Sequence, residues 1–344
     1  MTRFRQIHML TTYPPSNLNR DDSGRPKTAI VGGTTRLRIS SQSLKRAWRT
    51  SETFQHALAG AIGTRTKRVA EASYEKFVKA GIKPETATEW VKAITSVFGK
   101  PSDDGLRTGQ LAHIAPEEQV AVDRLVEVLI KAKRGPNEEE LLLLRKKPRA
   151  ADIAMFGRML ADSTQHNVDA AVQVAHAITV HAVTVEDDYF TAVDDLKPRE
   201  EDAGAGHVGV HEFGSGVFYS YVCIDTESLV DNLDGDAELA SNALGALLEA
   251  MATVAPSGKQ NSFASRAYAN YILVEKGNRQ PRSLSVAFLS GIRDGNVLPK
   301  AIAELEARVS AFDKSYGPLA DERKKLNVES GEGSFEELKK FIQS

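Results

Sequence analysis

The residues with the clearest chemical potential lie in residues 35–49, because cations recur there at helical spacing. From Gln42 onward, at about 3.6 residues per turn, one side of a helix gathers an amide and three cations, Gln42, Lys45, Arg46 and Arg49. The opposite side is apolar and consists of Leu44, Ala47 and Trp48. Lys45 and Arg49 would lie one turn apart and could hold successive phosphates of a nucleic-acid strand. The alternative is an ordinary solvated face, but no acid in this helix balances its cations.

The start of this helix is a second binding element. Ser40 and Ser41 precede Gln42 and supply hydroxyls suited to a helix cap. A helix start also exposes unpaired backbone N–H groups and the positive end of the helix dipole, which together favour phosphate. Residues 36–39 alternate arginine with apolar residues, which is typical of a half-buried strand. The pattern therefore predicts a strand that leads directly into a cationic helix.

Charge is distributed unevenly along the 344 residues, although the net charge is only −2. Residues 1–51 contain ten lysines or arginines against two acids, a net charge of +8, so the remainder carries −10. The overall balance argues against a uniformly basic nucleic-acid binder. A local basic surface on an acidic body is instead typical of a dedicated groove for a polyanion.

Residues 16–34 are rich in turn formers and are predicted to form a long loop beside the basic helix. Loops of this length without structure of their own are usually functional or disordered. Because this one carries Arg20, Arg25 and Lys27, we expect it to wrap the same ligand. Asp21 and Asp22 could bind a metal, but turn capping by aspartate is the favoured interpretation.

The remaining elements follow from hydrophobic periodicity and from proline and glycine boundaries. Strands are predicted over residues 4–12, with an end at Pro14 and Pro15, within 171–185, and over 211–224, 268–274 and 284–289. Helices are predicted through most of 53–161, including one with four leucines after the acidic run 138–140, and over 237–254, 298–312 and 335–342. A weakly structured hairpin should span about 184–211, where Tyr189 and Phe190 are either buried anchors or wedges between nucleobases.

This order of elements predicts an α+β fold, a ferredoxin-like or RNA-recognition-motif core interrupted by a helical insertion and a β-hairpin. Cys223 is the only cysteine, which favours a reducing compartment. No apolar run approaches the length of a membrane span, so we expect a cytoplasmic protein. The chain has neither a P-loop nor an H-E-x-x-H motif, and no acid–base pair stands out.

Several motifs together resemble a known family. They are Asn19-Arg20-Asp21-Asp22, Gly32-Gly33, the run from Arg38 to Ala47, and the stretches 175–179, 189–196 and 214–219. These motifs look like those of CasC, the backbone subunit of the type I-E Cascade complex in CRISPR immunity. They extend from the N-terminus to about residue 220, whereas the helical insertion and the C-terminal third match only loosely.

The resemblance implies an architecture like a right hand. Residues 1–52 and 171–344 would form the palm, residues 53–170 the helical fingers, and the hairpin at about 184–211 the thumb. Several copies would stack along one CRISPR RNA into a helical filament. Each thumb would displace one nucleotide at regular intervals, which leaves the other bases free to pair with target DNA. The implied partners are CRISPR RNA, target DNA through guide pairing, other copies of the chain and other Cascade subunits, with no membrane and no cofactor.

The resemblance also implies site residues. The family's RNA-backbone contacts fall here on Lys27, Ser40, Gln42, Lys45 and Arg49, with Arg20 and Lys259 as additions, and its base-displacing thumb segment falls on Tyr189, Phe190 and Thr191. Met159 ends a Gly-Arg-Met run that in the family carries a wedge, although the sequence after it diverges.

We therefore expect RNA binding without catalysis and without a bound metal, with sequence specificity supplied by the guide. One alternative is a metal-dependent endoribonuclease that uses Asp21, Asp22 or a histidine, since related CRISPR backbone subunits cut target RNA. The other is a purely structural helical scaffold whose basic helix is solvated surface.

Overall fold

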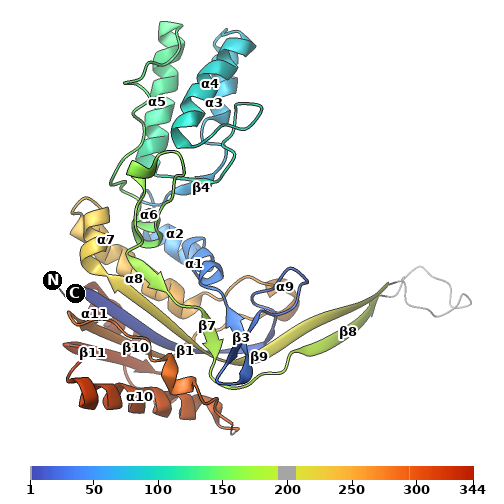
Figure 1. Ribbon diagram of the computed structural model, residues 1–344, viewed down its shortest axis with the longest axis vertical. Coiled ribbons are helices and arrows are strands. Elements are labelled where there is room, and N and C mark those ends of the chain that lie inside the picture. Colours follow the sequence, from blue (N-terminus) through green and yellow to red (C-terminus); the bar gives the residue numbers. More distant parts are fainter. Residues whose placement is uncertain (1, 193–206, 294) are drawn as a thin grey trace, which may run out of the picture.

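A computed structural model describes residues 2–192, 207–293 and 295–344 of the chain. These residues form an antiparallel sheet with helices on both faces, a helical lobe that stands away from the sheet, and a long two-stranded hairpin (Figure 1). The predicted α+β class is therefore confirmed.

The sheet is built from segments that lie far apart in the sequence. Its strand order is β11-β10-β1-β9-β7-β3-β2, and the neighbouring strands are antiparallel. The strands are β1 (Phe4–Ser16), β2 (Thr28–Val31), β3 (Thr34–Ile39), β7 (Ala177–Thr179), β9 (His207–Asp225), β10 (Ala269–Gly277) and β11 (Glu322–Asn327), with the short β6 (Val172–Val174) also paired to β9. The N-terminal, middle and C-terminal parts of the chain thus meet around β1.

β1 extends further than its sequence predicts. We expected Pro14 and Pro15 to end it, but the strand continues to Ser16. The pairing with β9 shifts register between Tyr13 and Ser16. The prolines, which have no N–H to donate, therefore occupy the irregular stretch where a regular ladder bond is not required.

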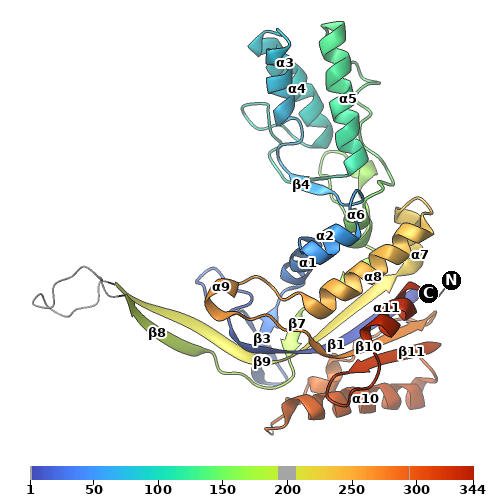
Figure 2. The same ribbon diagram turned by 180° about the vertical axis from the view of Figure 1, so that it is seen from behind.

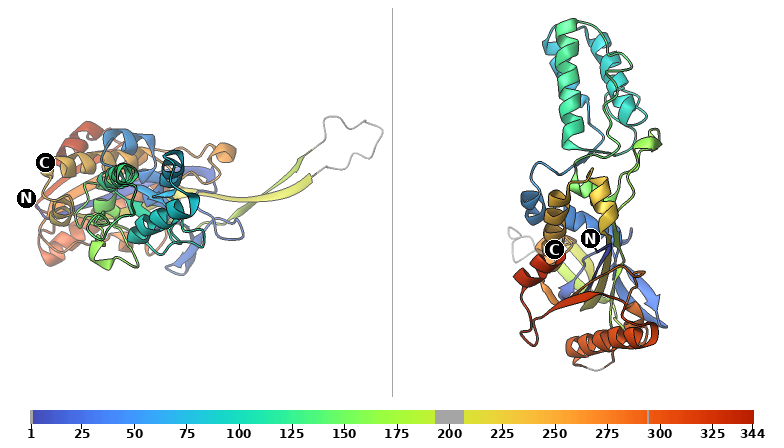
Figure 3. Two further views of the ribbon diagram at one scale, coloured as in Figure 1. Left: turned by 90° about the horizontal axis from the view of Figure 1, so that it is seen from above. Right: turned by 90° about the vertical axis from the view of Figure 1, so that its left-hand side faces the viewer.

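Successive side chains of β1 point into two different cores. Ile7 and Met9 lie in the core formed with α1, α2, α8 and α11, whereas Leu10 lies in the core formed with α10. The helices are α1 (Ser41–Arg49), α2 (Glu52–Ala57), α7 (Thr226–Asn232), α8 (Ala237–Thr253), α10 (Val297–Tyr316) and α11 (Phe335–Gln343). Accordingly α10 covers the face of the sheet opposite to α8 (Figure 3).

The helical lobe consists of α3 (Glu71–Lys79), α4 (Pro84–Phe98) and α5 (Pro116–Ala132) and has its own hydrophobic core. In it Phe77 meets Trp90 edge to face, with ring centroids 5.2 Å apart. A small sheet of β4 (Thr64–Thr66) and β5 (Ala112–Ile114), together with α6 (Ala151–Phe156), lies between the lobe and the main sheet (Figure 2). Phe54 of α2 and Met155 of α6 belong to the core of the main body, so the chain enters and leaves the lobe through packed helices.

The helix predicted after residues 138–140 is absent, and turns occupy this stretch. The Glu140 carboxylate accepts hydrogen bonds from the Arg134 guanidinium (2.7 Å) and from the Asn137 backbone N–H (3.0 Å). These bonds stabilise a turn instead of a first helical turn. Leu142 is 77% exposed, so the four leucines do not form one buried helical stripe.

The predicted hairpin is formed by β8 (Glu186–Ala192) and the outer part of β9 (Figure 1). Tyr189 pairs with Val210, and Ala192 pairs with His207. The central part of the predicted hairpin, residues 193–206, lies outside the described residues.

In the C-terminal third one predicted strand is wrong and one strand was not predicted. Residues 284–289 contain a 3₁₀ turn, η2 (Ser285–Phe288), instead of a strand, because the Leu284 N–H donates to the Tyr219 hydroxyl (3.0 Å) and Phe288 is buried against the sheet. β11 was not predicted because this edge strand is mostly polar and lacks apolar alternation. Within the described ranges, the model contains no helix with the length and hydrophobicity needed to cross a bilayer.

Candidate nucleic-acid interface

α1 forms as predicted and is held in place by its apolar side. The Ser40 hydroxyl caps the helix by accepting a hydrogen bond from the Ser43 N–H (3.4 Å). Leu44 and Trp48 are buried in the main core. The side that carries Gln42 and Lys45 therefore faces away from that core.

The cations of α1 differ in their availability. Neither Lys45 nor Arg46 forms an ion pair or a side-chain hydrogen bond with any described residue. Arg49, in contrast, has Nη1 3.4 Å from Oδ2 of Asp152, and its side chain is only 13% exposed. Part of the Arg49 guanidinium is thus already bound within the chain, which its prediction as a phosphate contact did not anticipate.

Asp152 is a buried carboxylate that joins α1 to the base of the lobe. Its Oδ1 accepts from the Gly63 N–H (2.7 Å), and its Oδ2 lies 2.8 Å from Nε2 of His113 in β5 as well as near Arg49. A buried carboxylate requires such donors. The sequence did not predict this cluster because the three partners lie 39 to 103 positions away from Asp152.

The stretch 16–34 is more ordered than the predicted long loop. β2 pairs with β3, and Arg20 forms a β-bridge with Pro26. Asn19 connects this stretch to α1, because its Oδ1 accepts from the Ser40 N–H (2.9 Å) and its backbone carbonyl accepts from the Lys27 N–H (2.8 Å). Two of the predicted contacts, Lys27 and Ser40, are therefore brought to the same residue.

Asp21 caps a turn, as the favoured interpretation predicted. Its Oδ1 accepts from the Ser23 hydroxyl (2.8 Å) and from the backbone N–H groups of Ser23 (3.0 Å) and Arg25 (2.9 Å). These bonds, the Ser23 hydroxyl first, lower the pKa of Asp21. Across the described ranges, the fold brings together no group of three or more His, Cys, Asp or Glu suited to a metal ion.

A cleft of about 600 Å³ separates this turn from α1. Arg20, Asp21 and Asp22 line it from the turn, Ser43 and Arg46 from α1, and Ser257 and Gly258 from the stretch after α8. A Cβ at Gly258 would lie 2.3 Å from the carbonyl oxygen of Leu18, so only glycine permits this close approach. The cleft places Arg20 beside α1 and adds Arg46, which the resemblance did not include.

Lys259 lies at the root of the long hairpin. It precedes α9 (Gln260–Phe263), and its Nζ is 2.6 Å from Nδ1 of His211 in β9. The His211 ring stacks on Phe190 at 4.4 Å between centroids. Lys259 therefore contacts the hairpin instead of lying free in the cleft.

The three predicted base-displacing residues occupy both faces of β8. Alternation places Tyr189 and Thr191 on one face and Phe190 on the other. Phe190 is half-buried on His211, whereas Tyr189 is 64% exposed. The sequence left open whether Tyr189 and Phe190 are buried anchors or wedges between nucleobases. The position of Phe190 fits an anchor, and Tyr189 has the exposure that a wedge requires.

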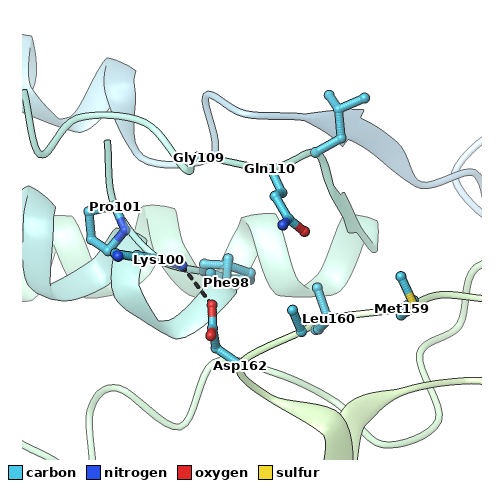
Figure 4. A pocket seen from close by; sticks show the side chains of 11 residues that line it. Phe98, Lys100, Pro101, Gly109, Gln110, Met159, Leu160 and Asp162 are labelled. Atoms are coloured by element: carbon cyan, nitrogen blue, oxygen red, sulfur yellow. Dashed lines mark hydrogen bonds between the residues drawn. The ribbon is translucent and has the colours of Figure 1, made fainter. Parts of the chain in front are cut away.

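Met159 lies in the region between the lobe and α6, at a pocket of about 350 Å³ (Figure 4). The pocket is lined by residues 98–101, 109–111 and 159–162. Met159 is 79% exposed, while the neighbouring Leu160 is buried. This pocket shares no lining residue with the cleft beside α1, so Met159 belongs to a separate surface.

Arg38 and His176 form a polar pair that the site prediction did not include. They lie beside Lys27, and Nη1 of Arg38 is 3.0 Å from Nδ1 of His176. Burial, then the positive charges of Arg38 and Lys27, lower the pKa of His176. The cationic surface therefore extends from α1 across β3 to the residue preceding β7.

Comparison with known proteins identifies one sequence family and solved structures with a similar fold. The sequence model of the family described as CT1975-like protein matches residues 6–342. A chain of a "CRISPR RNA-guided surveillance complex, pre-nicking" is 31% identical, with a TM-score of 0.83 over 99% of each chain. A chain of another "CRISPR RNA-guided surveillance complex" is 28% identical, with a TM-score of 0.62 over 96% of this chain and 91% of that one. Among curated proteins no match was found.

Proposed function

Because the chain belongs to the CT1975-like protein family, we propose that it is an RNA-binding backbone subunit of a CRISPR surveillance complex of the type I-E Cascade kind. The structural likeness to chains of two such complexes, which extends over nearly the whole chain, supports this proposal. The chemistry of the α1 surface supports it independently, since that surface suits an anionic polymer.

In this proposal the parts of the fold have the roles of a hand. The sheet and its covering helices are the palm, an interrupted RNA-recognition motif; α3–α5 are the fingers, and the β8–β9 hairpin is the thumb. Copies of the chain stack along the guide RNA in the cytoplasm as a helical filament. Each thumb, with Tyr189 exposed, displaces one base of the guide, and Met159 acts as a wedge on the finger side. The remaining bases pair with target DNA, and other Cascade subunits complete the assembly.

The observation that carries the proposal is the unbalanced cationic surface along α1. Lys45 and Arg46 have no acidic partner among the described residues. Arg20 lines the same cleft as Arg46, although Asp21 and Asp22 of the turn line it too. Lys27 is held through Asn19 at the same end of α1 as the Ser40 cap. Like charges this close repel one another, and bound phosphates relieve that repulsion.

The proposed activity requires no bond to be made or broken. Cations and hydroxyls hold the phosphates, and the base edges stay accessible, so specificity comes from pairing and not from the protein.

The proposal is tested by purifying the chain with its co-expressed neighbours and extracting nucleic acid. We expect a discrete RNA of uniform length, and we expect added labelled RNA to stay intact when Mg²⁺ is supplied. A preparation free of RNA would reject the binding role and favour the structural scaffold. Metal-dependent cutting of the labelled RNA would instead favour the endoribonuclease.

We expect the RNA affinity to depend on pH because of His176. Its pKa is lowered in the free chain by burial and then by Arg38 and Lys27, and a phosphate on those cations would raise it again. The bound chain would then take up a proton just below the ordinary histidine pKa of about 6.5. RNA affinity should therefore rise as pH falls through this window, and rise less in His176→Asn. Identical pH profiles of the two proteins in a binding titration would contradict this.

A further inference from the structure

Arg65 is an exposed residue of β4 for which neither the motifs nor periodicity predicted a role. The β4–β5 register pairs it with His113. Directly opposed side chains of an antiparallel pair lie on the same face of the ladder. Nε2 of His113 is 2.8 Å from the Asp152 oxygen that also contacts Arg49, so this face of the ladder is the one turned toward the end of α1.

Three arginines lie near this carboxylate, and one of them, Arg49, contacts it. Although Arg65 is exposed as a residue, partial desolvation of its guanidinium, then the nearby charge of Arg49, lowers its pKa; Asp152 opposes this lowering and Arg46 adds to it. Asp152 already accepts from Gly63, Arg49 and the His113 ring nitrogen. Counted over Arg46, Arg49, Arg65 and Asp152, the cluster has an excess of two positive charges.

The Arg65 side chain has no structural role that would account for its place. It makes no hydrogen bond or ion pair with any residue that the structure describes. A guanidinium held next to two others without its own acid is destabilised by repulsion, and an external anion would compensate. The fork of the guanidinium suits two oxygens of one phosphate.

We propose that Arg65 binds a phosphodiester of the same single-stranded RNA that α1 holds, so that the RNA-binding surface continues from the main body onto the base of the helical lobe. The inference rests on the proposed function and adds a binding residue to it. Arg46 and Arg49 supply the adjacent contacts on α1, and Asp152 orients Arg49 between them.

The test is a titration of the full-length chain with a fluorescein-labelled single-stranded RNA at several salt concentrations. We expect Arg65→Ala to weaken binding roughly three- to tenfold at low salt and to lower the salt slope by about 0.7, the value for one lost phosphate contact. Arg65→Lys should keep the slope, since it keeps the charge. Arg124→Ala is the matched control, because it removes an exposed arginine of α5, in the lobe beyond β4.

The outcomes separate this inference from the function on which it rests. If the wild-type chain binds RNA and Lys45→Ala weakens it, while Arg65→Ala binds like Arg124→Ala, the inference is overturned and the proposed function stands. If the wild-type chain binds no RNA, both are overturned. Unchanged thermal unfolding of Arg65→Ala, which its exposure predicts, assigns any loss of affinity to the missing contact.

Discussion

Replacing Glu275 with alanine should lower the free energy of unfolding by about 3–5 kcal/mol, the cost of leaving buried charges without their partner. Glu275 is fully buried in β10. Its carboxylate lies 2.6 Å from Nε of Arg323, 3.0 Å from Nη2 of Arg282 and 3.2 Å from Nε2 of His8. Alanine would leave the largely buried guanidinium of Arg282 without its carboxylate, whereas Arg323 at the sheet edge would keep Asp313.

The hydrogen bonds of His8 have defined directions in this buried network of Glu275, His8 and Tyr219. The Glu275 carboxylate can only accept a hydrogen bond, so Nε2 of His8 carries the proton and donates to it (3.2 Å). Because burial favours the neutral ring, Nδ1 of His8 accepts from the Tyr219 hydroxyl (2.9 Å), which itself accepts from the Leu284 N–H (3.0 Å). Every member of the chain of bonds depends on the carboxylate at its end.

Urea denaturation of the full-length chain measures the effect through the transition midpoint at constant slope. Glu75→Ala is the control, since Glu75 and Lys79 form an exposed pair (3.6 Å) on α3, whose loss should change stability by less than about 0.5 kcal/mol. A loss below about 1 kcal/mol in Glu275→Ala would mean that the freed arginines find water.

The same network sets the acid stability of the fold. Burial lowers the pKa of His8 even though Glu275 opposes it, and the bonds from His8 and Arg282 hold the pKa of Glu275 well below its ordinary value despite burial. In both cases the unfolded chain binds the proton more readily. Stability should therefore fall as pH drops below about 6.5, and fall further below about 4.3.

The second large effect is expected for Lys45→Ala combined with Arg49→Ala, which should weaken guide-RNA binding without changing its sequence preference. If each residue holds one phosphate, the salt slope falls by about 0.7 per contact, or about 1.4 for both. Filter binding of the wild-type and variant chains to two unrelated RNA sequences over a range of salt measures both quantities. Unchanged affinity and slope would reject both residues as contacts.

The pairing of Arg49 with Asp152 requires each single variant as a control. Lys45 has no described partner, so Lys45→Ala should reduce binding and leave thermal unfolding unchanged. Arg49→Ala also removes a donor from a buried carboxylate and should lower the melting temperature. Asp152→Asn distinguishes the two contributions of Arg49, because it frees the guanidinium while keeping an amide for the bond from Gly63.

The sequence predicted the elements that local periodicity determines. α1 and α8 were predicted correctly because their apolar residues recur at helical spacing. β1 was predicted from the alternation of residues 4–12, although its end was placed too early. The motifs around α1 also indicated a family of CRISPR surveillance-complex subunits, which the family match confirms.

The sequence could not predict contacts that only the tertiary fold creates. The residues next to Asp152 in the sequence form no motif. Its three partners come from segments that meet only at the base of the lobe. Arg65 lies in a strand of three residues, too short to show alternation. β11 was missed because edge strands tolerate charge, and its Arg323 is balanced by Glu275 and Asp313 from other elements.

The continuity of β9 restricts how the length of this chain can change. β9 has 19 residues and therefore measures about 60 Å at roughly 3.3 Å per residue, from the main body to the outer end of the hairpin. Because neighbouring side chains of a strand point in opposite directions, inserting a single residue between Gly214 and Val210 would turn every outer side chain to the other face. Insertions of two residues would keep the facing and extend the reach by about 7 Å. The strands of homologous hairpins should therefore differ in length by even numbers of residues. The reach of these hairpins should vary in steps of the same size.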